Sequence, residues 1–332
     1  MAKESAFTSG QERVTENRQG PLPHFGRQAC RSGDMYVIGT SARQMMTRLG
    51  AFTHALGLAA LSIAILIGAG AVQAAASNQE HETLFALAYD PGTDTLLKAD
   101  ANTLYRSGDR GQSWQNIAIR SPEDGKIAAV AASFAARGVM YVAGPGLGVV
   151  RTDDGGKTWV ERTEGLPSRD VIAVAAHTTQ PDTVYAVVKE HGIYRSQDAG
   201  KSWRMMDRGP RDGLVQLIHS DMAGSMQSGW LFAATPNGIR RIMDCFCLWQ
   251  DAGGLASEAR SVTYDPKQPE HIYAATEKGL FRSSDGGENW TEMTSPISNA
   301  VALVFGHSGT LYVINTDRRL FRSADQGVTW HR

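Results

Sequence analysis

Cysteine is almost missing from this sequence of 332 residues: there are three, and only Cys245 and Cys247 follow the one long apolar segment. So few cysteines exclude a disulfide framework, and the core must come from packed secondary structure. An excess of charge of one sign is also missing, because 33 basic and 34 acidic residues leave a net charge of −1. With no basic run or patch, the sequence argues against nucleic acid as a partner.

The N-terminal segment lacks the features of a folded domain. Residues 1–44 are rich in Gly, Ser, Arg and Gln without apolar periodicity, so we expect them to be disordered. Asp, Glu, Lys and Arg are absent from residues 49–78, and Arg43 and Arg48 precede this apolar stretch. We therefore expect residues 45–76 to be a signal peptide or membrane anchor that sends the rest of the chain across the membrane, to a periplasmic or other extracytoplasmic location.

Two interpretations of this segment stay open. Small residues at 72–76 fit a signal-peptidase site, which favours cleavage. A run of roughly 20 apolar residues can also span a bilayer, so an uncleaved form would contact the membrane through residues 49–76. Met45 and Arg48 make an ordinary short basic start, which leaves open that residues 1–44 belong to an over-extended start.

A pattern, Arg-Ser-x-Asp-x-Gly-x-x-Trp, recurs along the remaining chain. Its Asp residues are separated by 40 to 46 positions, the period of a four-stranded propeller blade, and six copies span residues 81–332. In each copy we expect Asp to accept backbone N–H groups in a turn, Gly to adopt positive φ, and Trp to pack between sheets. The residues expected in this structural role are Ser107, Asp109, Gly111, Trp114, Asp154, Gly156, Trp159, Ser196, Asp198, Gly200, Trp203, Asp244, Trp249, Ser283, Asp285, Gly287, Trp290, Ser323, Asp325, Gly327 and Trp330.

Each copy begins with a short apolar run in which Ala and Val are frequent. Small side chains suit an inner strand, where sheets crowd near an axis. The predicted inner strands are residues 84–89, 127–132, 171–176, 214–218, 261–264 and 301–305. The sequence thus predicts an all-β fold, a six-bladed β-propeller of four-stranded antiparallel blades joined by the turns described above.

The recurring residues resemble the Asp-box, or BNR, repeat over essentially all of residues 81–332. Sialidases, sortilin-type receptors, xyloglucanases and the photosystem II stability and assembly factor carry such repeats. The resemblance implies the architecture and leaves the function open. The expected function is that of an exported, non-enzymatic binding or assembly scaffold, similar to the photosystem II assembly factor, without a cofactor. Its expected partner is a protein complex in or near the membrane, and the oligomeric state is open.

The alternative function is a sialidase-like glycoside hydrolase, with a glycan as ligand. The resemblance would require an Arg-Ile-Pro motif, which is absent; the nearest string is residues 238–242. The recurring Arg residues stand at one register of the repeat, so we expect framework residues and no arginine triad. Xyloglucanases, which carry the same repeat, are larger enzymes with two propellers, and the six copies here would form one propeller only. No catalytic residue is therefore assigned.

A binding surface, if present, is expected where residues precede the inner strands, because these gather around one mouth of the central channel. The candidate mouth residues are Lys126, Arg169, Asp170, Arg211, Glu258 and Arg260, with His81, Glu82, Asp212 and Asn299 at equivalent positions. Polar loop ends are also expected simply because they contact water.

The fourth copy breaks the pattern. It has Cys245, Phe246 and Cys247 after its Asp244, and five Met residues lie between 205 and 243. Thiol, thioether and imidazole groups suit copper(I), so Cys245 and Cys247, with His219 nearby, are a candidate soft-metal site. Simple packing and a disulfide are the alternatives. His177, His219 and His307 occupy similar positions in different repeats, and we expect them to be far apart.

Overall fold

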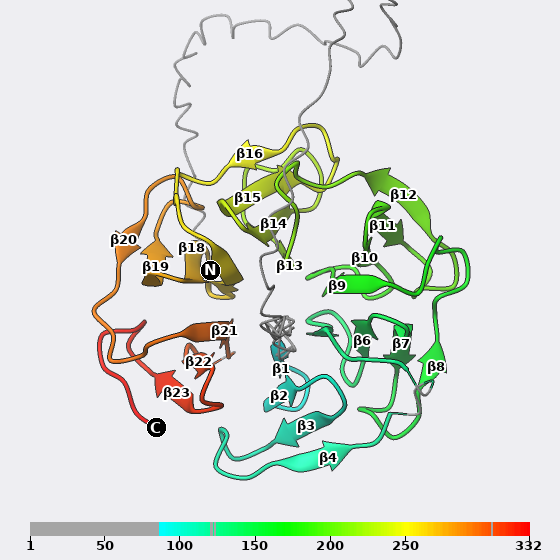
Figure 1. Ribbon diagram of the computed structural model, residues 1–332, viewed down its shortest axis with the longest axis horizontal. Helices are drawn as coiled ribbons and strands as arrows, with labels where there is room; N and C mark the ends of the chain where they lie inside the picture. Colours follow the sequence, from blue (N-terminus) through cyan, green and yellow to red (C-terminus); the bar gives the residue numbers. More distant parts are fainter. Residues whose placement is uncertain (1–85, 120–121, 123, 307) are drawn as a thin grey trace, which may run out of the picture. The chain divides into compact units, whose positions relative to one another are not determined.

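Six antiparallel sheets form a ring around a central channel in the computed structural model (Figure 1). The structure describes residues 86–119, 122, 124–306 and 308–332. The chain divides into two units, Met1–Gln73 and Ala74–Arg332, and every described strand belongs to the second. The predicted disordered segment 1–44, the signal or anchor segment 45–76 and the residues His81, Glu82 and His307 lie outside the described residues.

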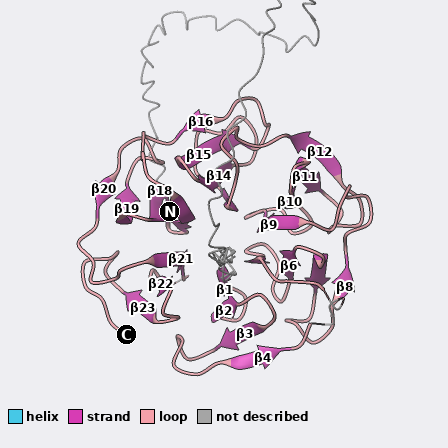
Figure 2. Cartoon of the chain, in the orientation of Figure 1, coloured by secondary structure: helices cyan, strands magenta, loops and turns pink. Residues whose placement is uncertain are grey.

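The described residues form strands, turns and loops (Figure 2), and no helix among them is long and apolar enough to cross a membrane. The sheets are numbered blades 1 to 6 in chain order. Blades 1 to 3 contain β1 (Ala86–Asp90), β2 (Thr95–Ala99), β3 (Leu104–Ser107), β4 (Gln115–Ile117), β5 (Ala129–Ala132), β6 (Met140–Gly144), β7 (Gly148–Thr152), β8 (Val160–Glu161), β9 (Val171–Ala176), β10 (Val184–Val188), β11 (Gly192–Ser196) and β12 (Arg204–Asp207). Blades 4 to 6 contain β13 (Gln216–Ser220), β14 (Trp230–Thr235), β15 (Gly238–Met243), β16 (Gln250–Asp251), β17 (Ala259–Asp265), β18 (Gln268–Thr276), β19 (Gly279–Ser283), β20 (Thr291–Glu292), β21 (Ala300–Phe305), β22 (Leu311–Asn315) and β23 (Leu320–Ser323).

Each blade is a meander in which consecutive strands pair, and the first strand lies nearest the channel (Figure 1). The all-β, six-bladed prediction is confirmed. Blades 1 to 5 have four strands. Blade 6 has three, and an isolated antiparallel bridge between Arg322 and His331 stands at its outer position.

The core consists of apolar layers between neighbouring blades. One cluster combines Leu97 and Leu104 of blade 1 with Met140 and Val142 of blade 2, all fully buried. The β-branched and small side chains of these strands suit such flat, close contacts. Because each layer needs residues from two blades, no blade buries its apolar faces alone.

The same kind of layer closes the ring between the first and last blades. Leu87, Tyr89 and Leu96 of blade 1 pack with Tyr312 and Ile314 of blade 6. The ends of the ring are therefore held together by the burial of these side chains.

Candidate functional site

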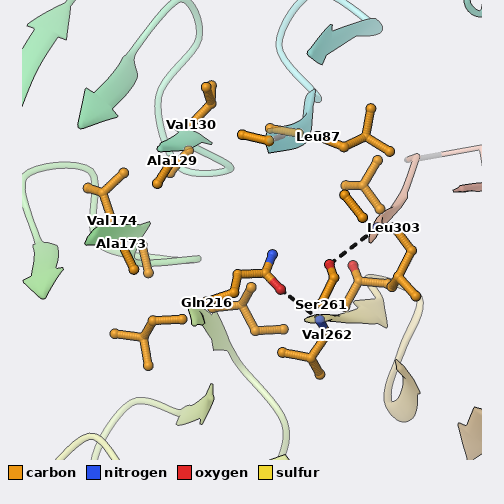
Figure 3. Close-up of a pocket in the computed structure, with 18 of the residues that line it drawn as sticks. Leu87, Ala129, Val130, Ala173, Val174, Gln216, Ser261, Val262 and Leu303 are labelled. Atoms are coloured by element: carbon orange, nitrogen blue, oxygen red, sulfur yellow. Dashed lines mark hydrogen bonds between the residues drawn. The ribbon is translucent and has the colours of Figure 1, made fainter. Parts of the chain in front are cut away.

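The channel contains a cavity of about 740 Å³ that is lined by the inner strands of all six blades. Figure 3 shows apolar side chains from several blades around it, among them Leu87, Val130, Val174 and Leu303. Their small and branched shapes leave the axis unfilled while the layers between blades stay packed. The cavity is mostly apolar in its wall and formed by rigid strands, which is the usual character of a ligand pocket.

Polar side chains in the wall mainly join one blade to the next. The Val262 N–H donates to Gln216 Oε1 at 2.7 Å, and the Leu303 N–H donates to Ser261 Oγ at 3.2 Å (Figure 3). These bonds satisfy inner-edge N–H groups that would otherwise face the channel. These bonds between blades fix the wall in place.

Two of the six predicted mouth residues line the cavity: Glu258 and Arg260. They form an ion pair, with Arg260 Nε 3.7 Å from Glu258 Oε1. Both are partly exposed, so the pair adds little to stability and its charges remain accessible.

The other four do not line the cavity. Lys126 Nζ donates to Asn102 Oδ1 at 2.9 Å, and Arg169 pairs with Glu161. Asp170 and Arg211 are exposed. These four residues stay predictions for a broader binding surface around the mouth.

The recurring pattern forms a hydrogen-bonded turn, here called the motif turn, that runs from the motif Ser or Thr to the Trp. In blade 3 the Gly200 N–H donates to Ser196 Oγ at 2.7 Å, and Ser196 Oγ donates to Asp198 at 2.7 Å. Ser202 donates to the same carboxylate from its backbone N–H, at 2.9 Å, and from its hydroxyl. These bonds stabilise the carboxylate, chiefly those from Ser202, and hold the pKa of Asp198 at about 2.

The motif turn of blade 4 is different, and its Asp points inward. Asp244 is 1 % exposed and accepts hydrogen bonds from Ser228 and Ser225, which belong to the long β13–β14 loop. The reason lies in the sequence, because Ile242 replaces the motif Ser or Thr, and Leu248 replaces the Ser, Thr or Asn that precedes the Trp in the other copies. Without these partners the carboxylate is free to turn toward blade 3.

The inward Asp244 joins a buried histidine pair, which corrects the sequence prediction for two of the three histidines. His177 and His219 were expected to be far apart, but their ring centroids are 3.8 Å from each other. They come from adjacent blades: His177 follows β9, and His219 lies in β13. The prediction failed because neighbouring blades pack face to face, so residues in successive repeats can touch.

Hydrogen bonds determine which nitrogen of His177 carries the hydrogen. Its Nδ1 accepts from the backbone N–H groups of Thr179 and Gln180, both at 3.2 Å. The hydrogen is therefore on Nε2, which donates to Ser228 Oγ at 2.9 Å, and Ser228 donates in turn to Asp244. The result is a relay from His177 through Ser228 to Asp244.

His219 completes the cluster with an unusual feature. Thr178 contacts its Nδ1 at 2.9 Å, whereas its Nε2 is buried and has no partner among the described residues. Burial, together with a smaller effect of the neighbouring His177, lowers the pKa of His219 to about 3. Burial also lowers the pKa of His177, against an opposing effect of Asp244, so both rings are neutral near pH 7.

The cluster has donor types that can hold a metal ion, since donor atoms of His177, His219 and Asp244 lie within 4.8 Å of one another. A metal-bound histidine usually donates its second N–H to an oxygen, however. Nδ1 of His177 instead accepts hydrogen bonds from two backbone N–H groups, so a histidine that bound a metal ion through Nε2 would have no N–H to donate to an oxygen. The geometry fits a hydrogen-bonded core better than a metal centre.

The predicted soft-metal residues do not gather around this cluster. Cys245 and Cys247 contact each other across the motif turn of blade 4, with 2.6 Å between the Sγ atoms. Met205 and Met226 are 43 % and 70 % exposed, and Met222 packs against blade 5. The soft donors are therefore spread over several surfaces.

Comparison with known proteins finds two family models, each of which matches a part of the chain. Residues 73–227 match the family model of the photosynthesis system II assembly factor YCF48, and residues 249–332 match that of the DUF6242 beta propeller domain. The chain is a β-propeller, and part of it is similar to a BNR-type assembly factor family. The chain is also similar to the xyloglucanase of Hypocrea jecorina, at 29 % identity over 84 residues, which cover 23 % of this chain and 10 % of the enzyme.

Solved structures similar to this propeller include YCF48 from Cyanidioschyzon merolae, at 16 % identity and a TM-score of 0.51, with 75 % of this chain and 84 % of that one covered. The GH74 enzyme of Niastella koreensis has 17 % identity and a TM-score of 0.51, with 74 % of this chain and 46 % of that one covered. At these identities the likeness concerns the fold alone. The chain spans less than half the length of the enzyme structure and a tenth of the curated relative.

Proposed function

We propose that this chain is an exported, non-enzymatic assembly scaffold that binds a protein segment at the channel mouth marked by Glu258 and Arg260. The observation that carries the proposal is the match of residues 73–227 to the model of an assembly factor family. The expected site of export is extracytoplasmic, through residues 45–76, and the expected partner belongs to a membrane-associated protein complex.

The chemistry of the channel wall is suited to a peptide-like ligand. Its apolar wall can bury side chains, while Glu258 and Arg260 at one end can pair with charges or backbone groups of a partner. Val215, which is 49 % exposed, adds apolar surface to the cavity lining. A protein segment with apolar side chains and a charged flank satisfies both regions.

A pull-down with a mouth variant tests this proposal. Substituting Arg169, Arg211 and Arg260 together by Gln should abolish recovery of the partner after crosslinking in membranes, because these cations face the solvent at the mouth. The matched control substitutes Arg110, Arg137 and Arg204, which are exposed near the motif turns at the other end of the strands. Equal loss with the control, or unchanged recovery with the mouth variant, would contradict the proposal.

The alternative is a glycoside hydrolase, favoured by the similarity to a xyloglucanase over 84 residues. Hydrolysis of this kind needs two carboxyl groups on either side of the scissile bond. Among the described residues that line the channel cavity, Glu258 is the single carboxylate. We therefore expect no release of reducing ends from xyloglucan, and measurable release that depends on Glu258 would favour the enzyme.

A further inference from the structure

Five motif turns share one set of hydrogen bonds that closes the turn. In each, the Ser or Thr oxygen accepts a Gly N–H and donates to the Asp, which also accepts from the residue before the Trp. The Gly donors are Gly111, Gly156, Gly200, Gly287 and Gly327, and the residues before the Trp are Ser113, Thr158, Ser202, Asn289 and Thr329.

The motif turn of blade 4 has lost all of these bonds. Ile242, Phe246 and Leu248 occupy the three positions, and Asp244 bonds to another loop instead. One local backbone bond remains, from the Phe246 N–H to the Met243 oxygen at 2.8 Å. The chain nevertheless turns sharply here, with Phe246 at a φ of 58°, a conformation that costs energy for a large side chain.

The two cysteines are placed where the missing bonds would be. The structure has them as two thiols with their Sγ atoms 2.6 Å apart, so a small movement brings the sulfurs to the roughly 2.05 Å of a disulfide bond. Two sulfurs bound to one tetrahedral metal ion at about 2.3 Å each would be roughly 3.8 Å apart. The spacing therefore favours a sulfur–sulfur bond over a shared metal ion.

We propose that Cys245 and Cys247 form a reversible disulfide that closes the motif turn of blade 4 in place of the lost hydrogen bonds. The oxidant is a second disulfide, on a small molecule or a protein. The exposed Cys247 thiolate attacks that disulfide, forming a mixed disulfide and releasing one thiol. The Cys245 thiolate then attacks the Cys247 sulfur and releases the second thiol.

The exchange balances without another reactant. The cysteine pair loses two electrons, the oxidant gains two, and the two thiol protons end on the two released thiols. Because Asp244 directly precedes Cys245, the disulfide would also restrain the residue that holds Ser228 and, through it, His177. This proposal is independent of the binding function proposed above.

Mass spectrometry tests the bond directly. The full chain is incubated with glutathione disulfide, alkylated with iodoacetamide and digested with trypsin, which places both cysteines on the peptide Ile242–Arg260. The expected peptide is lighter than its reduced form by two hydrogen atoms and bears neither alkyl group nor glutathione. A doubly alkylated or glutathione-modified peptide would overturn the proposal.

Thermal unfolding tests whether the bond closes the turn. The oxidised protein should unfold at a higher temperature than the reduced protein, and the Cys245→Ser/Cys247→Ser variant should unfold at one temperature under both conditions. An equal shift in the variant, or no shift in the native protein, would overturn the structural role. Copper(I) binding that prevents oxidation of the native pair and is absent from the variant would identify a metal site instead.

Discussion

At the scale of single residues, the buried histidine pair gives the clearest dependence on pH. The folded-state pKa of His219 is about 3, below the ordinary value near 6.5, so the unfolded chain binds the proton more tightly. Its contribution to stability is complete above about pH 6.5 and is lost as the pH falls toward 3. Each pH unit in this window costs up to about 1.4 kcal/mol of unfolding free energy.

The expected result is a shallower loss of stability on acidification for His219→Gln than for the native chain, measured by urea unfolding at several pH values. Some slope remains in the variant, because burial also lowers the pKa of His177. His191→Gln serves as the control, since that side chain is exposed. Identical slopes in the native chain and His219→Gln would contradict the described burial of the ring.

The sequence pattern predicts the Ser, Asp and Gly of the motif turn but omits one partner. The residue before each Trp is Ser, Thr or Asn in five copies, and its side chain donates to the motif Asp. This regularity was visible in the sequence and points to a hydrogen bond within the turn. The inward turn of Asp244 was not predictable in the same way, because Ser228 lies in another loop.

At the scale of elements, the motif Trp residues connect the outer parts of neighbouring blades. The Trp203 indole N–H of blade 3 donates to the Arg162 oxygen next to blade 2, at 2.8 Å. Trp290 makes the same kind of bond from blade 5 to Ala252, also at 2.8 Å. These hydrogen bonds supplement the apolar packing between neighbouring blades and fix the orientation of the indole rings.

Blade 2 offers a matched comparison for this contribution, because Trp159 Nε1 is buried without a partner among the described residues. Trp203→Phe should lower the free energy of unfolding by about 1 kcal/mol more than Trp159→Phe, since only the first removes a hydrogen bond. Denaturant unfolding of both variants measures the difference. Equal effects would mean that the Trp203 bond contributes nothing beyond packing.

The strand bounds show how accurately individual elements could be predicted from the sequence. The predicted inner strand 171–176 matches β9, whereas 214–218 precedes β13 by two residues. Leu214 and Val215 look like strand residues because they are apolar, but they lie before the strand at the channel mouth. Tertiary position, which composition does not report, decides the strand ends.

At the scale of the whole molecule, six repeats and their period were sufficient to predict a six-bladed ring, and the prediction is confirmed. Repetition makes this possible because each blade needs its neighbours to bury its faces. The contact between His177 and His219 was not predicted, because it depends on which faces of neighbouring blades pack together. The mouth residues stay predictions, with Glu258 and Arg260 alone among the six lining the cavity.

The most direct measurement for the proposed binding function is site-specific photocrosslinking at two equally exposed positions. Val215 lines the channel cavity and is 49 % exposed, whereas Met205 lies on the outer strand β12 and is 43 % exposed. A photoreactive residue at position 215 should capture a protein partner in membranes, and one at position 205 should not. Capture at 205 alone, or equal capture at both positions, would contradict binding at the channel mouth.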